Sequence, residues 1–267
     1  MTPPCGGAAD PRSGRQASAG RTDKQTLGNL GGGIVLNPKV VRRFRRIARW
    51  LIAEPYKRLL GYTLAFGLRV NYFDYPPGRW PPPTPARKYI DEFLSLYQHE
   101  VRGRCVEFAP PYYREKFSNN PSVTSYDVWD IEPGEGITII GDLQDASHIP
   151  DSSFDTIICT HVLCCIPRPW LAVAELHRIL SPGGLVLCTN PVVAPKYAPH
   201  PKDCWRFTYD SMEILFSNFK KVNIHCFGNA ATAAASPFFL MTYHFPRWVL
   251  EMHDEYCPIV VAVAAWK

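Results

Sequence analysis

Short runs of hydrophobic residues recur along the chain after Arg104, separated by polar turns and by stretches with helical spacing. We interpret seven runs as strands: residues 105–108, 123–129, 137–142, 154–163, 185–190, 220–228 and 258–266. Runs of this length, rich in β-branched and aromatic residues, are typical of buried strands. Residues 169–180, between the fourth and fifth runs, have helical spacing instead. Strands that alternate with helices predict an α/β domain, with a mainly parallel sheet and helices on both faces.

The chain before this domain has a different composition. Residues 1–36 are rich in Gly, Ala, Ser, Arg and Pro and are predicted to be disordered, because they have few large apolar side chains to bury. Residues 37–100 are expected to form a helical extension: a basic amphipathic helix, a proline-rich connector at 72–85 and a second helix from Ala86. The α/β domain is then residues 101–267.

The predicted basic helix has two distinct sides. Val40, Phe44, Ile47 and Leu51 share one stripe, and the opposite side carries Arg42, Arg43, Arg45, Arg46 and Arg49. In one interpretation the stripe packs on the domain and the arginines are solvated. In the other, residues 37–60 contact an anionic membrane surface or an anionic partner.

Charge and cysteine content narrow the function classes. The formal net charge is +5, and the excess of Lys and Arg lies in the N-terminal region, so the domain itself is not predicted to bind nucleic acid. The nine cysteines form no Cys-x-x-Cys pair, which predicts buried thiols in a reducing compartment and no metal site. No apolar run reaches the roughly 18–20 residues of a membrane helix, and no signal-peptide core is visible. We therefore expect a cytoplasmic protein.

Residues 141–191 contain three landmarks in order: "GD" at the end of the third run, "IPDSSFD" before the fourth and "ELHRILSPGG" before the fifth. Together they resemble the core of the class I S-adenosylmethionine-dependent methyltransferases. Residues 199–229, which include "WRFT", resemble a type 11-like subgroup whose members often accompany polysaccharide or secondary-metabolite pathways. The resemblance covers residues 104–267. It implies a Rossmann-like methyltransferase fold with a seven-stranded sheet, and S-adenosylmethionine as the cofactor.

The resemblance also implies which residues meet this cofactor. In an open parallel sheet, ligands bind beyond the carboxyl ends of the strands, where the strand order reverses. Glu107 is expected beside the methionine ammonium. Asp127 is expected at the ribose hydroxyls, with Asp130 as the competing residue and a surface acid as the alternative role. Asp142 and the amide of Leu143 are expected to read the adenine edge, unless Asp142 caps a helix. The remaining predicted contacts are Phe108, Ala109, Val128, Thr160 and His161, and the alternative for His161 is a packed core histidine.

Candidate catalytic residues follow the fifth run. His200 is the predicted general base for a hydroxyl acceptor, and Asp203 would orient it or bind substrate. Arg206 would hold an anionic group of the substrate, and Trp205 would form an apolar wall. The alternative for this segment is structural: the tryptophan packs, the arginine pairs with a carboxylate, and Thr208 caps a helix.

Two stretches depart from the family pattern. The family has glycines in the loop after the first strand, so that the backbone can approach the cofactor closely. Here Pro110 and Pro111 predict a stiff, extended path, followed by Tyr112, a predicted substrate contact. Cys164 and Cys165 replace a Glu-His or His-His pair and supply no strong base at neutral pH. Either the loop still wraps the cofactor, or binding is lost and the domain is a non-catalytic binding or scaffold protein. We expect the first, with O-methylation of a small molecule, a sugar or a secondary metabolite as the activity.

Overall fold

The computed structural model describes residues 55, 58–59, 61–62, 83–196, 202–238 and 240–267. The chain divides into two compact units, Met1–Gly61 and Tyr62–Lys267. The predicted disordered tail, nearly all of the predicted basic helix and the proline-rich connector up to residue 82 lie outside the described residues. The second unit contains the α/β domain.

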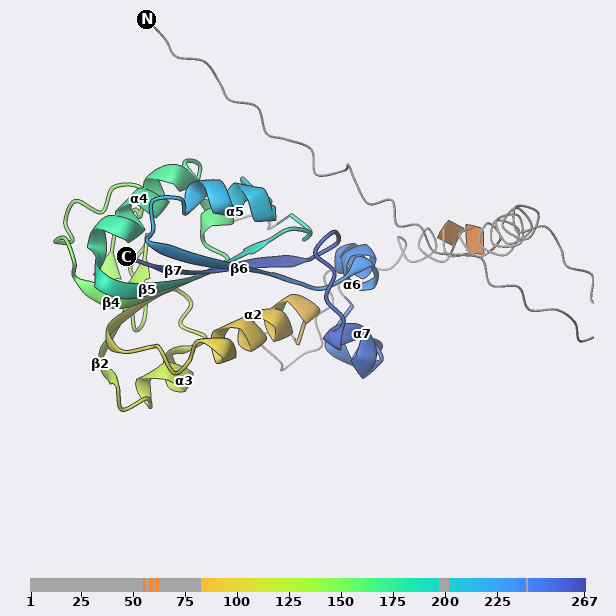
Figure 1. Ribbon diagram of the computed structural model, residues 1–267, viewed down its shortest axis with the longest axis horizontal. Coiled ribbons are helices and arrows are strands. Elements are labelled where there is room, and N and C mark those ends of the chain that lie inside the picture. The colour runs from red at the N-terminus through yellow and green to blue at the C-terminus, as the bar shows by residue number, and fades with distance from the viewer. Residues whose placement is uncertain (1–54, 56–57, 60, 63–82, 197–201, 239) are drawn as a thin grey trace, which may run out of the picture. The chain divides into compact units, whose positions relative to one another are not determined.

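A seven-stranded sheet lies at the centre of this domain, in the order β3-β2-β1-β4-β5-β7-β6. Strands β1 to β5 are parallel to one another, and β7 is antiparallel to both of its neighbours (Figure 1). The predicted Rossmann-like fold is therefore confirmed. The strands are β1 Gly103–Phe108, β2 Val123–Asp130, β3 Ile139–Ile140, β4 Phe154–Thr160, β5 Leu180–Pro191, β6 Lys221–Phe227 and β7 Val260–Trp266.

Helices cover both faces of the sheet. Figure 1 shows α4 and α5 on one face and α2 and α3 on the other. Side chains alternate along each strand, so β1 sends Val106 and Phe108 into the hydrophobic core under α4 and α5 and Cys105 into the core under α2. The helices are α2 Pro85–Leu96, α3 Arg114–Ser118, η1 Leu163–Cys165, α4 Pro169–Ile179, α5 Tyr209–Leu215, α6 Ala230–Ala235, η2 Ser236–Phe238, η3 Thr242–His244 and α7 Arg247–Glu251.

Helix α2 confirms the helical spacing predicted from Ala86. The Thr84 hydroxyl accepts a hydrogen bond from the Arg87 amide at 3.2 Å, and Pro85 occupies the first turn, where its missing N–H costs nothing. The side that faces the sheet carries Tyr89, Ile90, Phe93, Leu94 and Tyr97, all buried. This packing places the polar first turn of α2 at the end of the sheet.

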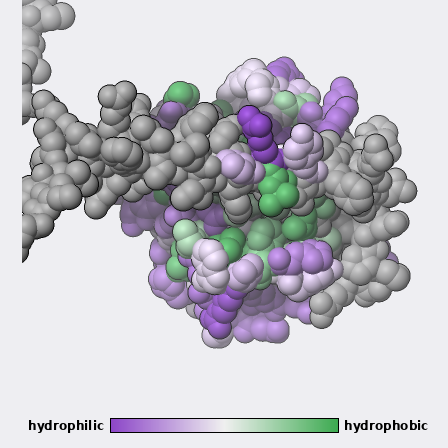
Figure 2. All heavy atoms as spheres, turned by 90° about the vertical axis from the view of Figure 1, so that its right-hand side faces the viewer, coloured by the Kyte–Doolittle hydropathy of each residue, from purple (hydrophilic) through white to green (hydrophobic). Residues whose placement is uncertain are grey.

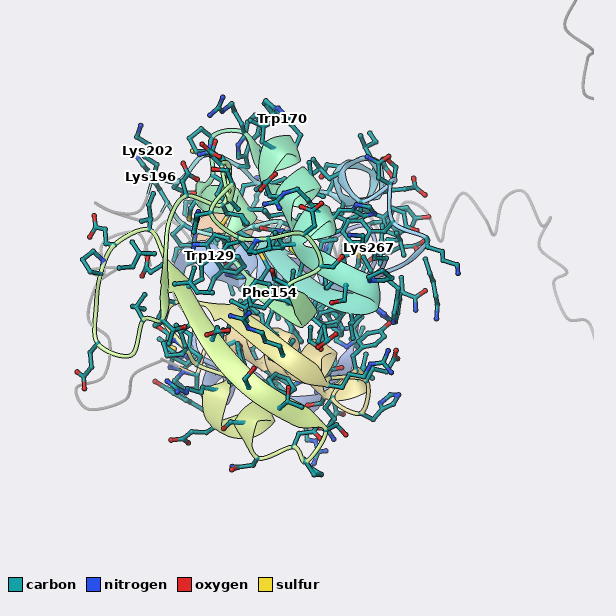
Figure 3. All side chains as sticks on the ribbon, turned by 90° about the vertical axis from the view of Figure 1, so that its left-hand side faces the viewer. Trp129, Phe154, Trp170, Lys196, Lys202 and Lys267 are labelled. Carbon is teal, nitrogen blue, oxygen red and sulfur yellow. The ribbon has the colours of Figure 1, made fainter. Side chains whose placement is uncertain are left out.

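The largest core side chains lie between the sheet and the helices. Trp129 and Phe154 are almost completely buried, whereas Trp170 is 53% exposed. Figure 3 shows the first two toward the middle of the domain and Trp170 at its edge. None of the helices in the described part of the chain combines the length and hydropathy of a membrane span.

Strands β3 and β4 are at least three residues shorter than their hydrophobic runs. The third run, residues 137–142, gives only Ile139–Ile140, because the Thr138 hydroxyl accepts a hydrogen bond from the Val128 amide next to the ladder (2.9 Å). The fourth run, residues 154–163, ends as a strand at Thr160, because His161 has a φ of +55° and leaves the extended conformation. Both strands end in turns at the end of the sheet where the carboxyl ends of the parallel strands lie.

Candidate functional site

The candidate site lies where the strand order reverses. From β1 the chain proceeds to β2 and β3 on one side, and then to β4 and β5 on the other. Strand β7 ends at the C-terminus on the left of Figure 1 and is antiparallel to β5, so the carboxyl ends of β1 to β5 point to the right. Figure 2 faces that side and shows hydrophobic residues near the centre of the coloured surface, with hydrophilic residues around them. Ligands of open parallel sheets bind at this position.

Glu107 lies one residue before the end of β1 and is completely buried. Its carboxylate accepts hydrogen bonds from the Tyr113 amide (3.0 Å) and from the Tyr126 hydroxyl (2.7 Å). Burial raises the pKa of Glu107 to about 7, although both of these hydrogen bonds favour the charged form. A buried carboxyl with a pKa near neutrality is typical of functional sites. Tyr126 was missed at the sequence level, because it looked like an ordinary strand residue.

The loop after β1 turns tightly, so the predicted extended path is wrong. The Tyr112 amide donates to the Pro110 carbonyl at 2.8 Å, and the Ala109 amide donates to the Trp129 carbonyl at 2.9 Å. With the Tyr113 amide bound to Glu107, every backbone N–H from residue 109 to 113 has an acceptor within the protein. A cofactor at this loop would therefore meet side chains and carbonyl groups instead of backbone donors.

Two other predicted contacts near the loop are core side chains. Phe108 stacks on Trp129 with ring centroids 5.3 Å apart, and Val128 is completely buried. The Tyr112 ring is half-buried beside the loop. The side chains of Phe108 and Val128 therefore belong to the packed interior.

The two acids of β2 have different positions. Asp127 lies opposite Val106 in the middle of β1, and its carboxylate binds Arg104 Nε (2.8 Å) and the Thr138 hydroxyl (3.0 Å). Asp130 is the last residue of β2, one position beyond the Phe108–Trp129 pair that ends β1. The geometry therefore favours Asp130, the competing residue in the sequence analysis, as the acid that faces a ligand.

Asp142 and Leu143 follow β3, at the same end of the sheet as the carboxyl ends of β1 and β2. The Asp142 carboxylate accepts hydrogen bonds from the Gln144 amide (2.8 Å) and from the Gln144 side chain (2.9 Å). Leu143 is buried, and its amide has no acceptor among the residues that the structure describes. Gln144 therefore holds the Asp142 carboxylate in place.

Thr160 ends β4, the neighbour of β1, and His161 follows directly after it. Thr160 is half-buried, and the His161 amide donates to the Thr189 carbonyl of β5 at 2.7 Å. Burial, followed by the positive charges of Arg87 and Arg206, lowers the pKa of His161 to about 3. This imidazole is therefore neutral at physiological pH and too weak a base for a hydroxyl proton.

An ion pair holds the segment that contains "DCWRFT" in place. Arg206 binds both carboxylate oxygens of Asp203, with 2.8 Å between Nη2 and Oδ2, and the Asp203 side chain is only 2% exposed. Nη2 of Arg206 also donates to the carbonyls of Ala194 and Pro195, at 3.2 and 3.1 Å. The pair thus ties this segment to the chain that leaves β5, as the structural alternative expected. His200 lies outside the described residues.

Trp205 and Thr208 also have structural partners. The Trp205 indole N–H donates to the Ile166 carbonyl at 2.9 Å, and its ring is 39% exposed. The Thr208 hydroxyl accepts from the Ser211 amide and caps α5. Trp205 is therefore tied to the segment that follows η1, and Thr208 to α5, while the tryptophan stays partly exposed.

Cys164 and Cys165 lie in η1 directly after β4, with their sulfur atoms 3.7 Å apart. The hydrogen bond from the Cys164 thiol lowers the pKa of Cys165. Within the described residues, no three His, Cys, Asp or Glu side chains cluster closely enough to bind a metal ion. The candidate site thus combines carboxylates, aromatic rings, a threonine, two cysteines and a neutral histidine.

Comparison with known proteins finds similarity to methyltransferases over part of the chain. Residues 118–188 match the family model described as "Methyltransferase domain". A human relative, thiol S-methyltransferase TMT1B, is 26% identical over 168 residues, which are 60% of this chain and 57% of that protein. An S-adenosylmethionine-dependent methyltransferase from Archaeoglobus fulgidus aligns with a TM-score of 0.48 at 14% identity, over 68% of this chain and 94% of that chain. The N-methyltransferase NodS from Bradyrhizobium japonicum, solved with S-adenosylhomocysteine, aligns with a TM-score of 0.45 at 15% identity, over 77% of this chain and 97% of that chain.

Proposed function

We propose that this chain, which carries a class I S-adenosylmethionine-dependent methyltransferase domain, binds S-adenosylmethionine at the carboxyl edge of β1 to β4 and methylates a small molecule. The observation that carries the proposal is the position of three acids at the ends of neighbouring strands. Glu107 lies near the end of β1, Asp130 ends β2, and Asp142 follows β3 by two residues. Their spread suits the ammonium, the ribose and the adenine of one extended cofactor.

The chain's own residues would hold this cofactor as follows. Glu107 meets the ammonium and Asp130 accepts hydrogen bonds from the ribose diol. The Leu143 amide, next to Asp142, donates to the adenine edge. Thr160 and His161 lie beside the sulfonium, where the neutral imidazole adds no repelling charge. When bound, the cofactor supplies an activated methyl group. The protein then holds the acceptor atom in line with the methyl carbon, about 3 Å away.

The acceptor class depends on the base that the site supplies. The described candidates are weak bases: the pKa of His161 is about 3, and Asp203 is paired with Arg206. A hydroxyl acceptor, as expected from the sequence, therefore depends on His200. A thiol ionises near pH 8.5 and reacts as the thiolate without a strong base. Thiol methylation is thus a second candidate, and the activity named for the human relative favours it.

Calorimetry tests the proposal first. We expect S-adenosylmethionine and S-adenosylhomocysteine to bind the full-length chain, and the absence of binding at millimolar cofactor would favour the non-catalytic scaffold instead. Turnover with a panel of phenols, sugars and alkyl thiols then separates the two acceptor classes. His200→Ala should abolish methylation of a hydroxyl but leave methylation of a thiol within about twofold, because a thiolate needs no general base.

A further inference from the structure

Arg87 belongs to the first turn of α2, before the region that the family resemblance covers, and yet it reaches the loop after β1. Its Nη1 donates to the Tyr113 hydroxyl at 2.8 Å. Its guanidinium carbon lies 4.2 Å above the centre of the Tyr112 ring. The arginine is thus held against the loop that replaces the family's glycines.

Arg87 differs from the other half-buried arginines of this domain, because no carboxylate of the described residues contacts its guanidinium. Of the arginines that the structure describes, Arg87, Arg178 and Arg206 are half-buried. Arg178 pairs with Glu175, and Arg206 pairs with Asp203. No described carboxylate oxygen lies within 4.0 Å of Arg87. The charge of Asp91, one turn further along α2, acts on Arg87, but this carboxylate binds the Tyr113 hydroxyl instead of the guanidinium. A half-buried cation without an anion in direct contact can accept an anionic ligand.

The position of Arg87 suits a ligand of the candidate site. Arg87 binds the Tyr113 hydroxyl, and the Tyr113 amide binds Glu107 near the end of β1, so Arg87 lies beside the point where the strand order reverses. Nη1 is occupied by Tyr113, whereas Nε and Nη2 have no acceptor among the described residues. These two nitrogens form the edge of a guanidinium that binds a carboxylate with two parallel hydrogen bonds.

We propose that Arg87 binds the carboxylate of the methionine end of S-adenosylmethionine, while Glu107 on the other side of the same loop meets the ammonium. This inference rests on the proposed function. The methionine end is a zwitterion, and Arg87 and Glu107 supply the two opposite charges that it requires. The aromatic rings of Tyr112 and Tyr113 keep the arginine in position.

Decarboxylated S-adenosylmethionine tests the inference, because it keeps the sulfonium, the ammonium and the nucleoside but lacks the carboxylate. We expect the wild-type protein to bind S-adenosylmethionine roughly tenfold or more tightly than the decarboxylated compound, as for a hydrogen-bonded charge pair. In Arg87→Met this ratio should fall to near one through weaker binding of S-adenosylmethionine alone. Arg87→Lys should retain part of the preference. Lys88→Met, which removes the neighbouring charge, should retain all of it.

The outcomes separate the inference from the proposed function. No binding of either compound to the wild type would overturn both. Equal affinity of the wild type for the two compounds, with S-adenosylmethionine bound, would overturn the role of Arg87 alone. That role is also overturned if Arg87→Met weakens both compounds by the same factor, since a residue that only clamps the loop would give this result. If Arg87→Met misfolds, Arg87→Lys gives the decision, because a ratio in this variant as high as that of the wild type would overturn the role of Arg87.

Discussion

Replacing Glu107 by glutamine is expected to stabilise the fold at neutral pH and to weaken cofactor binding at the same time. Glutamine has nearly the same shape as glutamate. Its Oε1 can accept from the Tyr113 amide, and its Nε2 can donate to the Tyr126 hydroxyl oxygen, so both contacts of the carboxylate keep a counterpart. The substitution therefore removes the buried charge with little change in packing.

The size of the stability effect follows from the pKa of Glu107. Burial raises this pKa from 4.5 to about 7 in the folded protein. Between these two pH values the folded state keeps the proton and the unfolded chain releases it, so the unfolded state binds fewer protons. The free energy of unfolding therefore falls as the pH rises through this window and levels off above pH 7. A shift of this size corresponds to about 3 kcal/mol.

Urea unfolding of both proteins at pH 5, 6, 7 and 8 measures this term, since the difference between them isolates residue 107. Glu107→Gln should gain stability over the wild type as the pH rises to about 7, by up to ~3 kcal/mol in total. Its affinity for S-adenosylhomocysteine should fall by about 1.5 kcal/mol, or roughly tenfold, because the ammonium loses its counter-charge. A stability difference that does not change with pH would refute the buried, titrating carboxyl. If Glu107→Gln instead loses stability and cofactor affinity together, Glu107 is a purely structural residue.

Further substitutions test the other acids. Asp130→Asn should weaken S-adenosylhomocysteine binding about tenfold in calorimetry. Asp127→Asn should leave this binding unchanged and cost less than about 1 kcal/mol of stability, as for an exposed ion pair. Weaker binding by Asp127→Asn but not by Asp130→Asn would restore Asp127 as the ribose-binding acid. Asp142→Ala should lower the affinity for adenosine as well as for the full cofactor, and unchanged affinity for both would remove the adenine assignment. Asp203→Asn should destabilise the protein by ~3 kcal/mol in urea unfolding, because it leaves Arg206 without its partner, and full stability with lost turnover would show a catalytic role instead.

The sequence predicted the fold well, because strand identity depends on local patterns. All seven hydrophobic runs contain a strand, and the helix over residues 169–180 agrees with α4 to within one residue. The antiparallel direction of β7 has no local signal, because a strand buried on both faces has the same composition in either direction. That direction is set by the connection from β6, which pairs with β7 along its whole length.

The site was harder to predict, because strand register and helix packing determine which residues reach it. The stretch "YDVWD" contains Asp127 and Asp130 three positions apart, and only the pairing of Trp129 with Phe108 shows which acid extends past β1. The proposed role of Arg87 depends on how α2 packs on the sheet, which no sequence motif encodes. Asp203 and Arg206 are three residues apart in the sequence. This spacing is compatible both with two substrate-binding residues and with a structural ion pair.

The loss of the glycines is compatible with cofactor binding, because S-adenosylmethionine does not need backbone donors at this loop. Amide donors at a glycine-rich turn are most valuable for phosphate groups, which are multiply charged acceptors. The methionine end carries one ammonium and one carboxylate, and single side chains can satisfy both. In this chain the loop amides bind inward to Pro110, Trp129 and Glu107, which fixes the loop before any ligand arrives. A loop that is already ordered loses little conformational entropy on binding. In the proposed complex Glu107 and Arg87 supply the charges from fixed positions, so the proline turn is compatible with a rigid cofactor site.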